Sequence, residues 1–237
     1  MTRAAIVLQA RMGSTRLPGK VLAQLGRRSI LAHCVERLRL RSGLPVVVAT
    51  TERPEDDAVC AAASAVGAAV LRGPEQDVLA RYVLAAETYG LTHVVRATAD
   101  NPAVDIDAPR RTLDMLLRTG VGHVGEYGLP LGAAVEACTT RRLAPGTGGD
   151  GRGLRPRARH AVPQARPPRA GAGVAGAGRA APAGHPAHRG SADDLATIRD
   201  IFDLLGPHAG TAPLGDIIDA ADRVRPARDL MRGVLVR

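Results

Sequence analysis

The chain has 237 residues, of which 45% are hydrophobic, and this is enough for one sizeable core or for one domain with an appendage. No apolar run reaches transmembrane length, no signal-peptide pattern precedes the first strand, and the three cysteines are too widely spaced for a metal site. We therefore expect a cytoplasmic protein that does not enter a membrane.

The formal net charge of +9 would suggest nucleic acid as a partner, but its distribution argues against one. Residues 144–190 hold eight arginines and one aspartate, so +7 of the +9 lies in these 47 residues and the rest of the chain is nearly balanced. With no Trp, one Phe and three Tyr, the chain also offers few side chains on which single-stranded nucleic acid could stack.

Predicted strands and helices alternate along the first half of the chain. Short apolar runs predict buried strands over Ala4–Ala10, Leu44–Thr51, Ala68–Leu71 and His93–Thr98. Apolar residues at helical spacing predict helices over Ser29–Arg41 (with Ser29 as its N-cap), Asp56–Val66, Asp77–Tyr89 and Asp107–Arg118. Such alternation is typical of βαβ units and a parallel sheet, in which ligands bind beyond the carboxyl ends of the strands.

The most informative feature is the loop RMGSTRLPGK that follows the first predicted strand. A loop of this composition can bring backbone N–H groups, a hydroxyl and fixed positive charge to a polyphosphate. Lys20 is the only lysine of the chain, which indicates that it is kept for its chemistry. The spacing matches neither the P-loop nor the GxGxxG template, and a surface turn with solvated arginines is the alternative. The residues that carry the pattern are Arg11, Gly13, Ser14, Arg16, Gly19 and Lys20.

Residues 144–190 interrupt this organisation. Thirty-eight of these 47 residues are Gly, Ala, Pro or Arg, and neither a helical nor a strand period is present, so we expect the segment to be disordered. A basic linker and an RNA-binding tail are the ordinary interpretations. Beyond it, apolar spacing predicts a helix over Leu195–Leu205, stopped at Gly206-Pro207, and a second over Leu214–Val224 that ends before Pro226.

The loop motif resembles the signature of the cytidylyltransferases that activate acidic sugars, and within them the spore-coat polysaccharide synthesis branch. Three further matches follow in the expected order, and together they cover about Met1–Leu143 and resume near Ser191. They are RGPEQDVLARY (Arg72–Tyr82), VVRATADNPAVD (Val94–Asp105) and GLPLGAAVEA (Gly128–Ala137).

The resemblance implies a role for each matching residue. It implies Arg11, Gly13, Ser14, Arg16 and Lys20 as ligands of the CTP phosphates. Of these, Lys20 and Arg11 are the implied catalytic residues, and Lys20 neutralises charge on the leaving pyrophosphate. It implies Asp100 as a ligand of Mg²⁺ (or Mn²⁺), Asp77 and Arg81 as neighbours of the nucleotide base, and Glu136 as a residue of the acceptor-sugar side.

Each of these residues also has a purely structural interpretation. Asp100 can form an Asx-turn before Asn101-Pro102, Asp77 and Arg81 can form a surface i,i+4 ion pair, and Glu136 can be a solvated loop carboxylate. Asp56-Asp57 is better explained as a helix cap than as a metal site.

Two family features are missing from the chain. Gly190 stands where the family carries a second metal-binding aspartate, and the family's Glu-His-Val-Thr-Pro-Tyr segment, which helps to form the sugar pocket and the dimer contact, is absent. We therefore expect weak CTP binding and little or no turnover.

A frame-shifted reading of an ordinary enzyme core explains residues 144–190. Shifting the codons of Pro156–Pro163 by one nucleotide permits Arg-Glu-His-Val-Thr-Pro-Tyr, and the same shift lets Ala187–Arg189 encode Leu-Thr-Val, both as in the resembled family. One base gained near Leu143–Gly146 and one lost near Gly190 would produce both changes. A genuine Gly/Arg-rich insert is the alternative.

The sequence thus predicts an α/β, Rossmann-like nucleotide-diphospho-sugar transferase fold with a mostly parallel sheet. Residues 1–143 form its nucleotide-binding half, and residues 191–237 form a C-terminal helical segment of the same domain. The predicted function is transfer of CMP from CTP to a sugar or sugar acid for surface or spore-coat polysaccharide, with CTP and an acidic or phosphorylated sugar as partners. The sequence leaves the oligomeric state open, and a homodimer is one candidate. A glycosyltransferase, which would need a DxD-type metal motif, and an inert domain with a basic RNA- or anion-binding tail are the alternatives.

Overall fold

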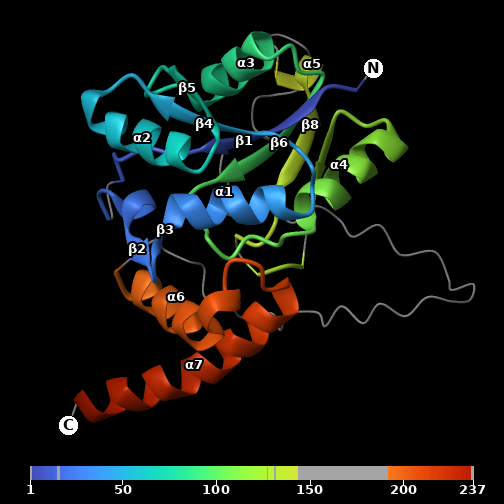
Figure 1. Ribbon diagram of the computed structural model, residues 1–237. Helices are drawn as coiled ribbons and strands as arrows, with labels where there is room; N and C mark the ends of the chain where they lie inside the picture. The colour runs from blue at the N-terminus through green and yellow to red at the C-terminus, as the bar shows by residue number, and fades with distance from the viewer. Residues whose placement is uncertain (1, 15–16, 127, 131, 144–191, 236–237) are drawn as a thin grey trace, which may run out of the picture.

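Six strands form the main sheet among the residues that the computed structural model describes, which are 2–14, 17–126, 128–130, 132–143 and 192–235 (Figure 1). The first four strands of the sheet are parallel, and the last two run antiparallel to their neighbours. The predicted mostly parallel α/β sheet is therefore confirmed. The strands lie in the order β5 (Ala69–Gly73), β4 (Val46–Thr51), β1 (Ala4–Gln9), β6 (His93–Thr98), β8 (Glu136–Thr139) and β7 (His123–Gly125).

Helices cover both faces of the sheet (Figure 1). One face packs against α3 (Val78–Thr88) and α5 (Thr140–Leu143). The other face shares its core with α1 (Ile30–Leu40), α2 (Asp57–Ala65), α4 (Ala108–Thr119), α6 (Ala192–Leu205) and α7 (Leu214–Leu235).

No helix in the described part of the chain has both the length and the apolar composition needed to cross a membrane.

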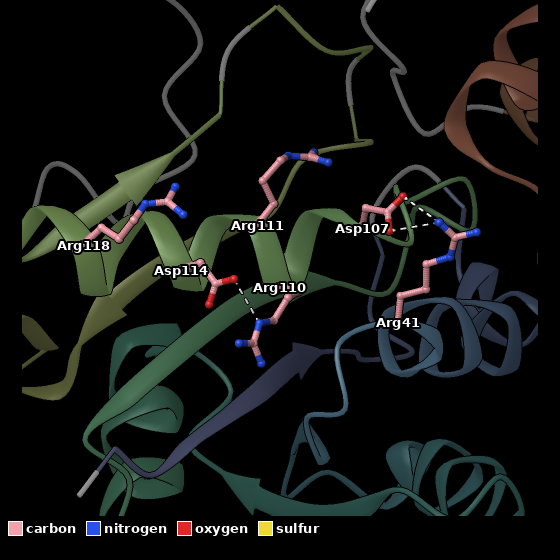
Figure 2. Close-up of a pocket in the computed structure, with 6 residues that line it drawn as sticks. All are labelled: Arg41, Asp107, Arg110, Arg111, Asp114 and Arg118. Atoms are coloured by element: carbon pink, nitrogen blue, oxygen red, sulfur yellow. Dashed lines mark hydrogen bonds and ion pairs between the residues drawn. The ribbon is translucent and has the colours of Figure 1, made fainter. Parts of the chain in front are cut away.

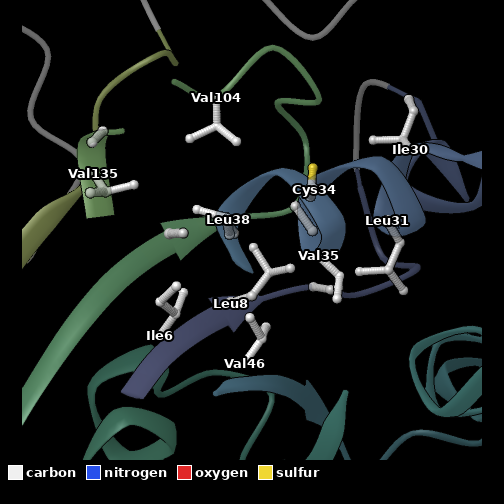
Figure 3. Close-up of a cluster of buried hydrophobic side chains, with 14 of the residues drawn as sticks. Ile6, Leu8, Ile30, Leu31, Cys34, Val35, Leu38, Val46, Val104 and Val135 are labelled. Carbon is white, nitrogen blue, oxygen red and sulfur yellow. The ribbon is translucent and has the colours of Figure 1, made fainter. Parts of the chain in front are cut away.

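The larger core lies between the sheet and α1 (Figure 3). Because side chains alternate along a strand, Ile6 and Leu8 of β1 face α1, whereas Ala5 and Val7 face α3. The apolar stripe of α1 covers Leu8, and the sulfur of Cys34 points toward the segment that follows β6 (Figure 3). Ser29 caps α1 as predicted, since its hydroxyl oxygen accepts a hydrogen bond from the Ala32 N–H at 3.2 Å.

Three local features differ from the sequence prediction. A short hairpin of β2 (Gln24–Leu25) and β3 (Arg28–Ser29) precedes α1, and the two strands β7 and β8 complete the sheet. These strands have two to four residues, which is too short for alternation to be recognised. The helix predicted to end before Pro226 continues to Leu235, because a proline in a helix removes a hydrogen bond without forcing the chain to stop. The predicted disordered segment, 144–190, lies outside the described residues.

Arg37 ties the C-terminal helices to the core. Its fully buried guanidinium donates to the carbonyl oxygens of Val104, Ala209 and Ala212, each at 2.9 Å. Val104 follows β6, whereas the two alanines lie between α6 and α7. Burial lowers the pKa of Arg37 to about 10, so the side chain remains charged at neutral pH. Hydrogen bonds from a charged donor contribute about 1.5–3 kcal/mol each, so this one side chain holds three segments together.

We predict that Arg37→Lys lowers the free energy of unfolding by about 2–4 kcal/mol, because an ammonium group lacks the planar fork that reaches three carbonyls. Urea denaturation followed by circular dichroism measures the change. Arg39→Lys is the matched control at an exposed position of the same helix, with an expected change below about 0.5 kcal/mol. Equal stability of the Arg37→Lys protein and the wild type would contradict the role given to Arg37.

Candidate functional site

The carboxyl ends of β1, β4 and β6 meet at one edge of the sheet. Pairing continues just past β1, since the Ala10 N–H donates to the Ala49 carbonyl at 3.1 Å and the Ala99 N–H donates to the Gln9 carbonyl at 2.9 Å. The basic loop after β1 and the turn that carries Asp100 therefore leave the sheet side by side. This is the edge at which parallel α/β sheets bind ligands.

The basic loop folds around the backbone of Met12. The Met12 N–H donates to Asp56 Oδ1 at 2.7 Å, and the Met12 carbonyl accepts from the N–H groups of Ser14 (2.8 Å) and Gly19 (3.1 Å). Gly19 has a φ of 70°, in the left-handed region that favours glycine, and it directly precedes Lys20, the first residue of η1 (Lys20–Leu22). The loop is thus a closed turn that ends on Lys20.

Two further predicted loop residues have different outcomes. The hydroxyl oxygen of Ser14 accepts a hydrogen bond from the Leu17 N–H at 3.4 Å, and a hydroxyl that accepts can also donate its own proton. Arg16 lies outside the described residues.

A carboxylate lies beside the first half of the loop. Glu75 Oε1 is 4.0 Å from Arg11 Nη1, and Glu75 Oε2 is 3.1 Å from Arg53 Nη1. A Cβ placed on Gly13 would lie 3.9 Å from the same carboxylate. The Arg11 side chain is nevertheless 39% exposed, so it can turn to a ligand at the sheet edge. Glu75 is a nearby acidic group that the sequence analysis did not single out.

Asp77 and Arg81 build the turn that carries Glu75. Asp77 caps α3, accepting from the Ala80 N–H at 2.9 Å, and Arg81 donates to the carbonyls of Pro74 and Glu75. Within the described residues Arg81 is only 1% exposed, and its Nε and Nη2 have no hydrogen-bond partner. Burial and the nearby charge of Arg11 lower its pKa. The i,i+4 ion pair considered from the sequence is absent from the described residues, because both side chains bind backbone instead.

The charges of Asp100 and Lys20 both influence Cys34, which lies in the N-terminal half of α1. Burial, and after it the charge of Asp100, raises the pKa of the Cys34 thiol to about 12, while a hydrogen bond with the Asn101 backbone and the charges of Arg37 and Lys20 act in the opposite direction. Asp100 is exposed just past the end of β6. Lys20 from the loop and Asp100 from the next turn are therefore both within electrostatic range of this one buried sulfur.

The loop before β8 lies against the turn after β6. The Asp105 N–H donates to the Ala133 carbonyl at 2.9 Å. Gly132 has a φ of 90°, and a Cβ built there would lie 1.0 Å from the side-chain nitrogen of Asn101. The Asn101 amide thus occupies the space that any side chain at position 132 would need, next to Asp100.

Glu136 does not lie with the basic loop and Asp100. It is paired with Arg96 across β6 and β8, with Arg96 Nη1 donating to Glu136 Oε2 at 2.8 Å and His123 Nε2 lying 3.4 Å from the same oxygen. Burial would raise the pKa of Glu136, but the hydrogen bonds and charges of His123 and Arg96 outweigh burial and lower it. This cluster lies on the face of the sheet that packs against α3, opposite α1, because Arg96 stacks on Tyr82 with 5.8 Å to the ring centroid. Its role on the acceptor side stays a prediction.

A metal ion would find a partial ligand set at this edge. The described residues contain no group of three His, Cys, Asp or Glu side chains that could hold one. Asp100 supplies an exposed carboxylate, and Mg²⁺ commonly binds one or two carboxylates while phosphate oxygens and water complete its shell. The chemistry of the donor therefore fits Mg²⁺, provided that the substrate brings phosphates.

A separate hollow of about 330 Å³ lies along α4 (Figure 2). Its charged side chains largely satisfy one another, with Arg41 and Asp107 3.2 Å apart and Arg110 and Asp114 3.0 Å apart. None of the predicted nucleotide-binding residues that the structure describes lines it, so we assign the candidate site to the sheet edge. The lining residues are Arg41, Asp107, Arg110, Arg111, Asp114 and Arg118.

Comparison with known proteins gives a consistent result. Residues 4–152 match the family described as Cytidylyltransferase. The chain is 36% identical over 137 residues to the spore coat polysaccharide biosynthesis protein SpsF of Bacillus subtilis, covering 56% of this chain and 55% of that protein. It is 35% identical over 127 residues to a 3-deoxy-manno-octulosonate cytidylyltransferase of Anaeromyxobacter, covering 52% and 49%. The chain thus spans about half the length of these curated relatives.

Among solved structures, a cytidylyltransferase from Leptospira borgpetersenii superposes with a TM-score of 0.58. It is 34% identical in sequence, and the match covers 60% of this chain and 63% of that chain.

We predict that Gly132→Ala lowers the free energy of unfolding by about 1–3 kcal/mol more than Gly128→Ala, because only the first places a methyl group on Asn101. Both glycines have positive φ, 90° and 81°, but nothing lies within 4 Å of a Cβ at Gly128, so this variant is the matched control. Urea denaturation of both proteins gives the difference. Equal losses in the two variants would show that the contact with Asn101 has no energetic weight.

Proposed function

Since this chain belongs to the cytidylyltransferase family, we propose that its reaction is transfer of CMP from CTP to a sugar or sugar acid, with release of pyrophosphate, and that the two missing family features leave it with weak CTP binding and little or no turnover. In this reaction an acceptor oxygen attacks the α-phosphorus, and the bond from the α-phosphorus to the bridging oxygen of the β-phosphate breaks. The observation that carries the proposal is the closed basic loop that ends on Lys20 and leaves the sheet edge beside the turn that carries Asp100.

The loop is suited to bind the triphosphate. Arg11 and Lys20 provide positive charge, Ser14 provides a hydroxyl, and Gly13 adds no side chain between the backbone and a phosphate. We assign to Lys20 the neutralisation of charge on the leaving pyrophosphate. Preorganised donors of this kind contribute about 3–4 kcal/mol each when they face developing charge.

Asp100 would hold Mg²⁺ (or Mn²⁺) together with phosphate oxygens of CTP. A bound divalent ion neutralises charge on the α-phosphate and favours attack on it. In this proposal Asp77 and Arg81 act indirectly, because they build the turn that places Glu75 beside Arg11.

The acceptor in this proposal is an acidic or phosphorylated sugar destined for a surface polysaccharide. Two relatives support this class, since one is named for spore coat polysaccharide biosynthesis and the other for a 3-deoxy-manno-octulosonate substrate.

We predict that CTP with Mg²⁺ at about 100 times its Kd stabilises the wild type by about 2.7 kcal/mol. For a chain of this size that is a rise in Tm of roughly 5–10 °C. Lys20→Ala should remove most of the rise, and Asp100→Asn should remove its dependence on Mg²⁺, because each deletes a charge that meets the triphosphate. Differential scanning fluorimetry measures these shifts.

Arg27→Ala, an exposed charge removed outside the loop, is the control and should keep the full rise. A wild type that shows no shift with CTP, or a Lys20→Ala protein with the wild-type shift, would contradict the proposal.

We also propose that residues 144–190 are an out-of-frame reading of an ordinary cytidylyltransferase core. The family match ends at residue 152, inside this segment, and identity with the relatives covers only about half of their length. Resequencing the DNA that encodes residues 139–195 should reveal one extra base near Leu143 and one missing base near Gly190. A confirmed sequence without these errors would make the segment a genuine insert and leave the metal site with Asp100 alone.

A further inference from the structure

Asp56 is a buried carboxylate whose contacts are not those of a helix cap. It ends η2 (Pro54–Asp56), directly before α2, and it is 1% exposed. The sequence suggests that it caps α2, but in the described structure its side chain makes no capping hydrogen bond. A carboxylate taken out of water must be compensated by strong donors, so its true partners indicate its purpose.

Those partners belong to two different segments. Asp56 Oδ1 accepts from the Met12 N–H at 2.7 Å, and Oδ2 accepts from the Thr51 N–H at 3.2 Å and from the Thr51 hydroxyl. Thr51 is fully buried at the end of β4, where it pairs with Gly73 of β5. One carboxylate therefore joins a rigid strand end to the centre of the basic loop, 44 residues away in sequence.

The bond to Met12 fixes more than one atom. The Met12 N–H belongs to the planar peptide group that links Arg11 to Met12. The hydrogen bond to Asp56 therefore fixes the orientation of the backbone at Arg11, and with it the direction in which the Arg11 side chain points. The Met12 carbonyl then fixes the next part of the loop through Ser14 and Gly19, the residue before Lys20. The two residues assigned to catalysis are thus oriented from one anchored backbone position.

We propose that Asp56 is a positioning residue that preorganises the loop for a triphosphate, an inference that rests on the proposed function. Protein donors occupy both of its carboxylate oxygens, so its effect on a nucleotide passes through the loop that it holds. It keeps the loop folded before the nucleotide arrives, so the ordering cost is met in folding and not in binding. Without it, binding of phosphates must also order the loop, and both affinity and turnover fall.

Asp56→Asn tests this with minimal change of shape. The amide keeps one oxygen, but its NH₂ faces either the Met12 N–H or the Thr51 N–H, donor against donor. Isothermal titration with Mg²⁺–CTP and with inorganic tripolyphosphate should show affinity reduced about tenfold or more for both. Asp57→Asn, the same change at the neighbouring exposed carboxylate that pairs with Arg72, is the matched control and should change either affinity less than about twofold.

Hydrogen exchange separates loop positioning from general stability. In the free wild type the Met12 amide should be protected nearly as well as the amides of β1 and β4. In Asp56→Asn it should exchange at least about tenfold faster while those strand amides stay protected. A Met12 amide that exchanges in the free wild type at the rate of an unstructured peptide would overturn the proposal, even if the variant fails to fold.

The two proposals fail in distinguishable ways. A wild type that binds neither CTP nor tripolyphosphate would overturn the proposed function, and the role of Asp56 with it. A wild type that binds both, with unchanged affinities in Asp56→Asn, would overturn the role of Asp56 alone.

Discussion

The structure depends on β1 being hydrogen-bonded on both sides. Strand β1 pairs in parallel with β4 along one edge and with β6 along the other, and all of its central side chains are buried. Three parallel strands therefore end at the same edge, and whatever follows them must share that edge. The basic loop, the Asp56 segment and the Asp100 turn come from distant parts of the sequence, but this pairing leaves them side by side.

Two buried charges extend this arrangement beyond the sheet. Arg37 donates to three carbonyls that belong to the segment after β6 and to the connection between α6 and α7. Asp56 accepts from the backbone N–H of Met12, in the loop after β1, and from that of Thr51, at the end of β4. In both cases one charged side chain bonds backbone groups outside strands and helices, which are the three carbonyls for Arg37 and the Met12 N–H for Asp56. The same device thus fixes the C-terminal helices on one side and the basic loop on the other.

Local signals in the sequence were sufficient to predict the main strands and helices of the sheet and its covering layers. The apolar run of β1, the Ser29 cap and the spacing of α1 predict the elements that the structure contains. They also predict that the loop and Asp100 meet, because strand ends in a parallel sheet share an edge. The partners of individual side chains are not local properties. Asp56 suits a helix cap by position yet binds Met12, and Glu136 has a loop-like setting yet pairs with Arg96 across two strands.

The same reasoning separates nucleotide binding from acceptor recognition. Every described residue assigned to the triphosphate lies before position 101 and is anchored to strands that pair without help from the later part of the chain. The helices α6 and α7 pack onto the α1 face through apolar residues and through Arg37. Glu136, by contrast, lies on the opposite face with Arg96 and His123, away from Lys20. Under the proposed assignments, binding of a triphosphate can be retained by a chain whose acceptor side is altered, because the residues proposed for the two tasks lie on different strands and on different faces of the sheet.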